Sequence, residues 1–268
     1  RFLGCAERAG VSLGVQPTDT EKFHEERREF ETQIAKDERF TQGHYLISIR
    51  PTRYNPQAVQ PVSRILELVN RCQVRRHGWS FPFIVRGQEA TEQRSAGTPR
   101  RPKDWEEFWR MYQSGHFIYA VAYREDRPGQ NASDFLDRWP LQHAKNIGVS
   151  LSGVVNIDTV IFIATLAYDF AAGLVGPLAW DESVEVNLTL VKTADRVLVS
   201  TDPRAPIRRF WQATIPQIES RHIVEVKDLL AKTRTLAVTA ANEILERFAG
   251  ADVQSLDAFA AQREFFGE

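Results

Sequence analysis

The sequence predicts an α+β fold in which a mainly antiparallel mixed sheet packs against a buried central helix and C-terminal helices. Strand-like and helix-like segments follow one another without the regular strand–helix alternation of a parallel α/β fold. Residues 157–174 are apolar almost all round, as a buried helix is, and residues 182–192 alternate between polar and apolar side chains, as a half-covered strand does. These patterns favour a sheet with one helix at the centre of its core.

The composition is that of an ordinary globular protein. The chain has 268 residues, a net charge of −1 and 43% hydrophobic residues, so it can bury a full core without disulfides or metals. We expect a charged helix and arm over residues 1–42 and a single α+β domain over residues 43–268. Two cysteines without paired spacing and the lack of a signal peptide favour the cytosol. Because the sequence starts without Met, we expect a fragment or a trimmed chain, for which a domain upstream is one candidate partner.

Several short elements are predicted in the first third of the chain. Residues 20–37 form a charged helix with a narrow apolar stripe, and residues 44–49 form a strand that ends at Pro51. Residues 61–72 form a helix with one broad apolar face. Residues 79–85 form a short extended segment that belongs at an edge or in a loop.

The middle of the chain is predicted to hold a loop, a helix and a strand. Residues 86–103 are a polar loop with interspersed glycine and proline. Residues 105–113 form a helix that Asp104 caps, and residues 116–123 form a strand covered on both faces. A loop with one short helical piece follows over residues 127–140.

The apolar segment is expected to be a core helix rather than a membrane span. Asn156 caps its start, and Gly176 with Pro177 ends it. Residues 159–179 are apolar enough to cross a bilayer, but they include Asp169. An unpaired Asp near the bilayer centre costs about 3 kcal/mol. We therefore expect no membrane association.

The last third of the chain supplies further strands and the final helices. Residues 182–192 and 196–200 are predicted to form a hairpin, and residues 220–226 form another strand. Residues 227–248 and 255–266 are predicted to be two C-terminal helices.

Motifs for metals, phosphates and nucleophiles are absent from the sequence. The histidines fall at no metal-binding spacing, and no Gly-rich phosphate loop or nucleophile elbow occurs. We therefore predict no metal site, no catalytic residue and no cofactor. The six histidines are His24, His44, His77, His116, His143 and His222.

One enzymatic alternative is a metal-dependent nuclease. Glu225 and Lys227 have the acid-x-Lys spacing that places a carboxylate and an ammonium on one strand face, and Asp202 upstream supplies a second carboxylate. The simpler interpretation is a Glu and a Lys on a solvated strand end.

A basic stretch with interspersed aromatics favours nucleic-acid binding. Between Arg71 and Lys103 there are eight basic and two acidic residues. Arginines contact phosphates, and aromatic side chains stack on bases. The alternative is a solvated loop above the core. The candidate contacts are Arg75, Arg76, Arg86, Arg100 and Arg101.

Aromatic residues concentrate between Gly78 and Tyr123, where they suit either a core or a recognition surface. Their division into an extended segment, a helix and a strand favours packing for most of them. The residues that frame this recognition or packing centre are Trp79, Phe81, Trp105, Trp109, Tyr112 and His116.

The segments GWSFPF and YQSGHF, with the Leu-rich tail DLLAKTRTLAVTAANEILERF, give the chain a resemblance to a known family. Over about Gly43 to Phe266 it resembles the C-terminal region of bacterial Schlafen-AlbA-type DNA-binding or ATP-binding regulators. The AlbA-like domain of that family lies upstream of this region, and here only a Glu-rich helix stands in its place. The resemblance implies a bacterial regulatory protein and carries over no catalytic residue.

The function predicted from the sequence is a non-catalytic sensor or interaction module of a bacterial cytosolic regulatory or defence-type protein. Its expected partner is nucleic acid, or a protein or domain upstream in the longer chain. The nuclease that uses Asp202, Glu225 and Lys227 is one alternative. A structural or oligomerisation domain, with residues 20–37 as the contact, is another.

Overall fold

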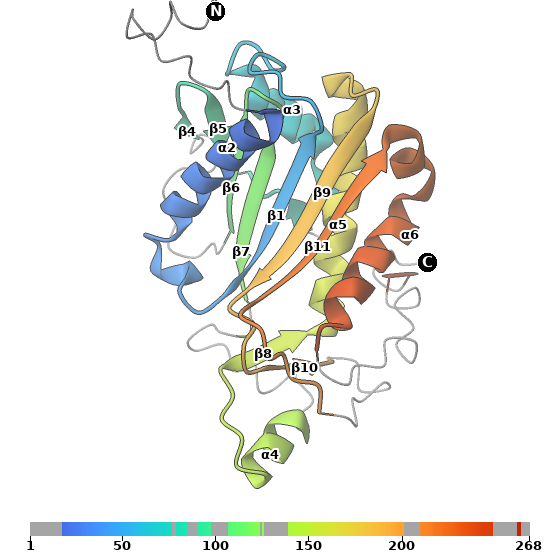
Figure 1. The fold of residues 1–268 in the computed structure, drawn as a ribbon. Helices are drawn as coiled ribbons and strands as arrows, with labels where there is room; N and C mark the ends of the chain where they lie inside the picture. Colours follow the sequence, from blue (N-terminus) through green and yellow to red (C-terminus); the bar gives the residue numbers. More distant parts are fainter. Residues whose placement is uncertain are drawn as a thin grey trace, which may run out of the picture.

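A seven-stranded antiparallel sheet forms the centre of the protein (Figure 1). The computed structural model describes residues 18–76, 79–84, 90–97, 107–123, 125, 139–200, 210–248 and 262–263. The strand order is β11-β9-β1-β7-β6-β5-β4, and every neighbouring pair is antiparallel. The strands are β1 (His44–Pro51), β4 (Ala90–Thr91), β5 (Ser95–Gly97), β6 (Glu107–Tyr112), β7 (Phe117–Ala122), β9 (Ser183–Val191) and β11 (Gln217–Glu225).

Helices cover the two faces of this sheet unequally, and the predicted α+β class is confirmed. Helices α3, α5 and α6 pack on one face, here called the inner face, while α2 crosses part of the other, the outer face (Figure 1). On the outer face α2 lies over β6 and β7 and leaves β9 and β11 open. The helices are α2 (Asp19–Ile34), α3 (Arg64–Cys72), α4 (Trp139–Asn146), α5 (Ile157–Leu178) and α6 (Val226–Leu245), with a 3-10 helix η1 (Glu38–Phe40).

Helix α5 is the predicted core helix. The Asn156 side chain accepts a hydrogen bond from the Asp158 N–H at its start, and the helix runs past the expected end to a left-handed Ala179. Among the described helices α5 has the length and hydropathy to cross a membrane, and 67% of its most apolar window is buried inside the protein. Burial of one large apolar side chain contributes about 1.5–3 kcal/mol, so α5 is a main source of stability.

The predicted helix over residues 105–113 is wrong in its described part, because β6 is a strand. The aromatics at 108, 109 and 112 fit helical spacing, but they also fit strand alternation. Trp109 and Met111 enter the inner core, whereas Phe108 and Tyr112 pack on the α2 side. Pairing with β5 and β7 buries all six residues of β6, so tertiary contacts override the local preference.

The predicted hairpin between residues 182–192 and 196–200 is also wrong. The second of these strands leaves the main sheet and pairs in parallel with a strand that the sequence did not predict. The buried guanidinium of Arg196 donates hydrogen bonds to three main-chain carbonyls and so fixes this strand. The two strands are β8 (Gly153–Asn156) and β10 (Arg196–Val199), and the other small sheet joins β2 (Val74–Arg76) to β3 (Trp79–Phe81).

Helix α2 confirms the predicted charged helix and ends slightly earlier than expected. Thr18 and Glu21 form a capping box at its start. Its buried Phe30 and Ile34 pack on the outer face of the sheet. Helix α6 confirms the predicted helix over residues 227–248. Most of the helix predicted at 255–266 lies outside the described residues.

Candidate functional site

The outer face of the sheet carries polar side chains at the margin of α2. Strand periodicity sends alternate residues of β1, β9 and β11 to this face, while those between them enter the core. A small hollow of about 50 Å³, partly open to solvent, lies here. It is lined by Phe23, His24 and Arg27 of α2, Ser48 and Arg50 of β1, His116 before β7, Glu185 and Asn187 of β9, and Glu219 and Arg221 of β11.

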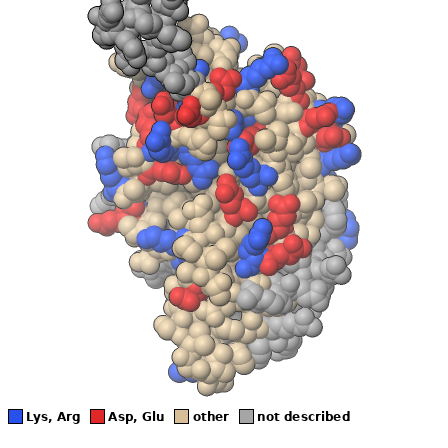
Figure 2. Space-filling model, viewed as in Figure 1, with Lys and Arg blue, Asp and Glu red and all other residues tan. Residues whose placement is uncertain are grey.

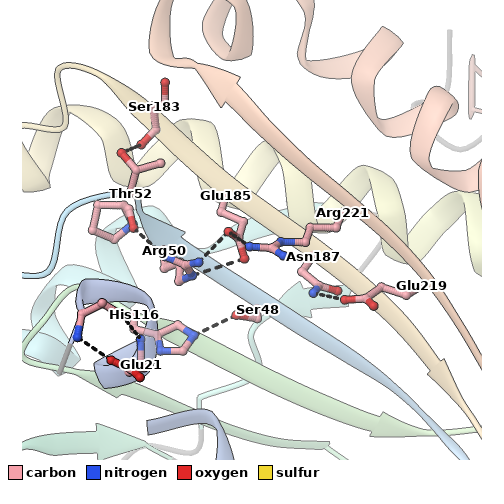
Figure 3. Close-up of polar contacts among 12 residues, drawn as sticks. Glu21, Ser48, Arg50, Thr52, His116, Ser183, Glu185, Asn187, Glu219 and Arg221 are labelled. Atoms are coloured by element: carbon pink, nitrogen blue, oxygen red, sulfur yellow. Dashed lines mark hydrogen bonds and ion pairs between the residues drawn. The ribbon is translucent and has the colours of Figure 1, made fainter. Parts of the chain in front are cut away.

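Three of the buried polar residues form a hydrogen-bonded series that we call the outer triad: Glu26, His116 and Ser48. The Ser48 Oγ lies 2.8 Å from His116 Nε2, and His116 Nδ1 lies 3.0 Å from Glu26 Oε2 (Figure 3 shows the Ser48–His116 contact). Helix α2, strand β1 and the turn before β7 each supply one member. The outer triad therefore joins α2 to the sheet.

The donors and acceptors in the outer triad follow from the carboxylate. An ionised Glu only accepts hydrogen bonds, so Nδ1 of His116 carries the proton and Nε2 accepts from the Ser48 hydroxyl. Burial lowers the pKa of His116, although the hydrogen bond to Glu26 opposes the shift. The imidazole is thus neutral at pH 7, with its basic nitrogen directed to a serine hydroxyl.

Further donors fix the Glu26 side chain. The Ser114 hydroxyl donates to Oε2 at 2.9 Å, and the Tyr54 hydroxyl donates to Oε1 at 3.1 Å. Burial, with Glu26 close by, raises the pKa of Tyr54 to about 12, so this hydroxyl keeps its proton. The carboxylate is held from three directions, which orients the imidazole.

An arginine–glutamate cluster lies next to the triad in the hollow. Arg50 Nε and Nη2 reach the two Glu185 oxygens at 3.2 and 2.6 Å, and Arg221 Nη2 reaches the same carboxylate at 2.8 Å (Figure 3). Arg27 from α2 donates to Glu31 at 2.8 Å. With Glu219, the lining has three arginines against two glutamates. Glu31, the partner of Arg27, brings the glutamates to three, so this cluster has no net charge, and Arg221 is the most exposed of its arginines.

Asn187 presents an oriented amide beside Ser48. It lies directly opposite Ser48 in the β1–β9 register. Its Oδ1 accepts from the Thr189 hydroxyl at 3.0 Å, and its Nδ2 donates to Glu219. These two contacts fix which end of the amide is the donor. An amide nitrogen carries two hydrogens, and Glu219 accepts one of them.

A second series of polar residues, which we call the inner triad, lies on the inner face: Tyr168, His222 and Glu243. The Tyr168 oxygen is 2.6 Å from His222 Nδ1, and His222 Nε2 is 2.9 Å from Glu243 Oε2. The Ser220 hydroxyl also donates to this carboxylate at 2.6 Å. Burial raises the pKa of Tyr168, so its hydroxyl is the donor to His222.

The predicted aromatic centre lies mostly in the core. Phe81, Trp109, Tyr112 and His116 are all buried. The Trp109 Nε1 donates to the Phe83 carbonyl at 2.9 Å, and the Tyr112 hydroxyl donates to the Glu26 carbonyl at 3.0 Å. The side chain of Trp79 and all of Trp105 lie outside the described residues.

The predicted nucleic-acid contacts are described for two of the five arginines. Arg75 is exposed, and its Nε donates to Gln73 at 3.1 Å. Arg76 lies 3.7 Å from the partly buried Asp169. Arg86, Arg100 and Arg101 lie outside the described residues, so nucleic-acid binding stays a prediction.

Two of the three predicted nuclease residues, Glu225 and Lys227, lie at the junction of β11 and α6. Glu225 and Lys227 are exposed and form a 2.7 Å ion pair, which is the solvated arrangement named as the simpler interpretation. Asp202 lies outside the described residues. Within the ranges that the structure describes, no three His, Cys, Asp or Glu residues gather as a metal site would require. The nuclease stays a prediction without structural support.

Sequence reasoning found His116 but missed its partners. Glu26 is 90 residues away and Ser48 is 68 residues away, so no local motif contains them. One signal was present: Ser48 lies in the strand predicted over residues 44–49, and Arg50, two positions later, is also polar. Polar residues at such positions mark the less apolar face of a sheet.

Comparisons with known proteins give no direct lead to function. No protein-family model, no curated protein and no solved structure matches this chain. The resemblance to Schlafen-AlbA-type regulators therefore stays a prediction, and function has to be inferred from the site itself.

Proposed function

We propose that this protein is a sensor or interaction module that recognises a small polar ligand with an anionic group in the outer-face hollow. The observation that carries the proposal is the convergence of Arg27, Arg50 and Arg221 on a part of the sheet that α2 leaves open. We also propose, as predicted from the sequence, that the chain belongs to a regulatory protein of the cytosol.

The arginines suit an anion because their positions are set before the ligand arrives. Arg50 is almost fully buried and is held by both Glu185 oxygens. Arg221 shares that carboxylate, but 46% of its side chain is exposed. A guanidinium has five N–H donors in a rigid fork that matches carboxylate and phosphate oxygens. Arg221 can therefore bind a ligand oxygen while Glu185 still holds it.

The size and charge of the hollow indicate the ligand class. The hollow has a cavity volume of about 50 Å³, well below the roughly 300–1,000 Å³ of ordinary ligand pockets, so it admits a single small group of a compact ligand. Lys and Arg alternate with Asp and Glu on this face rather than forming one basic field (Figure 2). A compact ligand with one anionic group and some hydrogen-bond donors for Glu185 and Glu219 fits this lining best.

Calorimetry and NMR titration with phosphate, phosphoserine and citrate test the proposal. We expect shifts in residues of β1, β9 and β11, and dissociation constants between about 10 μM and 1 mM. Arg221→Gln removes a charged hydrogen-bond donor, so it weakens binding about tenfold or more. Arg53→Gln is the matched control, because Arg53 is 79% exposed and pairs with Glu182 away from the hollow.

Two results would overturn this assignment. One is the absence of any binding of the three probes at about 10 mM, because a specific site has a dissociation constant well below that concentration. The other is tight low-salt binding of a single-stranded oligonucleotide that Arg75→Gln weakens and Arg221→Gln does not. That result would favour the nucleic-acid module predicted from the sequence.

A further inference from the structure

We infer that Ser48 is a nucleophile and that the outer triad hydrolyses small carboxylic esters that carry an anionic group. This inference rests on the proposed ligand site, because the arginines of the hollow would hold the anionic group beside Ser48. It adds a chemical step to a site proposed above only for binding.

The order of groups in the outer triad is that of an activated serine. Glu26 accepts from His116 Nδ1 at 3.0 Å, and Nε2 accepts from Ser48 Oγ at 2.8 Å. Both distances lie within the reach that nucleophile, base and orienting group need. A nucleophile, a base and a carboxylate in this geometry define such a site whatever their sequence order.

Contact with the hollow distinguishes this site from a hydrogen bond enclosed in the core. Ser48 and His116 are both among the residues that line the hollow. Glu26 is not among these lining residues. The serine and the imidazole therefore border the hollow, although their residues are only 4% and 1% exposed.

A donor for the developing oxyanion lies on the opposite strand. Asn187 is paired with Ser48 across β1 and β9, and directly opposite residues have Cβ atoms about 5 Å apart. Thr189 and Glu219 fix its amide orientation, which leaves a second Nδ2 hydrogen for a substrate oxygen. Removal of one such donor costs about 10²- to 10³-fold in rate in a serine hydrolase.

The proposed reaction balances with water as the second reactant. Ser48 Oγ adds to the ester carbonyl carbon and passes its proton to His116 Nε2, and Asn187 Nδ2 donates to the oxyanion. The bond to the alcohol breaks, and the alcohol takes the proton from Nε2. Water then gives a proton to Nε2 and adds to the acyl carbon. Collapse releases the carboxylic acid and returns the proton to Ser48, so nothing is oxidised or reduced.

Labelling with a fluorophosphonate probe, read by intact mass and peptide sequencing, tests the inference. We expect one adduct, on Ser48 in the tryptic peptide of residues 40–53, and none in Ser48→Ala. Ser220→Ala is the matched control, because Ser220 also belongs to a Ser, His and Glu cluster but lies outside the hollow. It should keep full labelling.

Two further measurements separate chemistry from folding. Glu26 is a positioning residue, so Glu26→Gln should slow labelling by about 10³-fold or more while phosphate affinity stays unchanged. We also expect faster hydrolysis of 4-acetoxybenzoate, which carries a carboxylate, than of phenyl acetate. Arg221→Gln should remove that preference. Circular dichroism of each variant confirms that it is folded.

The outcomes distinguish this inference from the binding proposal. Phosphate binding without any Ser48 adduct overturns the nucleophile and leaves the ligand site standing. Ser48 labelling without phosphate, phosphoserine or citrate binding supports the nucleophile and overturns the anionic-ligand class. Absence of both overturns both, and an adduct on other residues alone also overturns the nucleophile.

Discussion

The outer and inner triads place the same kinds of group in different surroundings. Each has a histidine between a carboxylate and a hydroxyl, at hydrogen-bond distances of 2.6–3.0 Å. In the outer triad the histidine and glutamate side chains are 1% and 9% exposed, whereas in the inner triad they are 17% and 44% exposed. The same hydrogen bonds should therefore contribute very different amounts to stability.

Burial explains the difference. A buried polar group that loses its partner keeps its full desolvation penalty, while a group near the surface exchanges its partner for water. Two triads with the same hydrogen-bond geometry should therefore contribute different amounts to the free energy of unfolding. Four predictions, from the largest expected effect to the smallest, test that conclusion.

Glu26→Ala should cause the largest loss. It removes the acceptor of Tyr54, Ser114 and His116 at once and leaves three donors near or in the core. We expect the free energy of unfolding to fall by about 3–5 kcal/mol, measured by urea denaturation. A loss below about 1 kcal/mol would show that water replaces the carboxylate easily, and the two triads would then be equivalent.

Lowering the pH from 7 to 5 should destabilise the protein. Burial lowers the pKa of His116, and it lowers the pKa of His44 to about 4. Below pH 6.5 the unfolded chain therefore binds protons that the folded protein does not, so stability is present above that pH and is lost as the pH falls. Each histidine contributes up to about 1.4 kcal/mol per pH unit.

Denaturation of wild type and His116→Gln between pH 5 and 7 measures this effect. The variant should lose stability with a shallower slope, because one of the two buried imidazoles is gone. An unchanged slope would mean that His116 takes up its proton in the folded protein as easily as in the unfolded chain.

Tyr168→Phe tests the buried end of the inner triad. It removes a hydroxyl that is hydrogen-bonded to His222 but keeps the ring in the core. We expect a loss of about 1–1.5 kcal/mol in the free energy of unfolding. A loss as large as that of Glu26→Ala would contradict the dependence on burial.

Glu243→Ala should have the smallest effect. Its carboxylate is 44% exposed, so water can replace it as the partner of His222 and Ser220. We expect a loss below about 1 kcal/mol, measured under the same conditions as for Glu26→Ala. The ratio of the losses in free energy of unfolding for Glu26→Ala and Glu243→Ala measures how much burial increases the contribution of a triad to stability.

Local sequence patterns predicted those helices and strands whose burial is visible in the periodicity of their own residues. The all-apolar α5 and the alternating β9 were predicted because a helix that is apolar all round and a strand with one apolar and one polar face have distinct periods in the sequence. β6 was predicted as a helix because its aromatics fit both periods. β10 was placed in a hairpin because its true partner, β8, lies 43 residues earlier in the register.

The candidate site could be predicted only in part, because it is assembled by the sheet. His116 drew attention through the aromatics around it. Ser48 and Asn187 become neighbours only through the β1–β9 pairing, which no spacing in the sequence indicates. The Arg75 and Glu225 motifs, which are local in sequence, were easier to find but lie outside the hollow.

The contacts of Glu26 have a consequence for the order of folding. They join α2 to Tyr54, Ser114 and His116 across 28, 88 and 90 residues of chain. Closing long loops costs entropy that is recovered only when the distant partners are already in place. We therefore predict that helix α2 docks late, after the β6–β7 hairpin has presented His116. Its amide hydrogens should then exchange with solvent earlier than those of β1 or β7, as a separate cooperative unit.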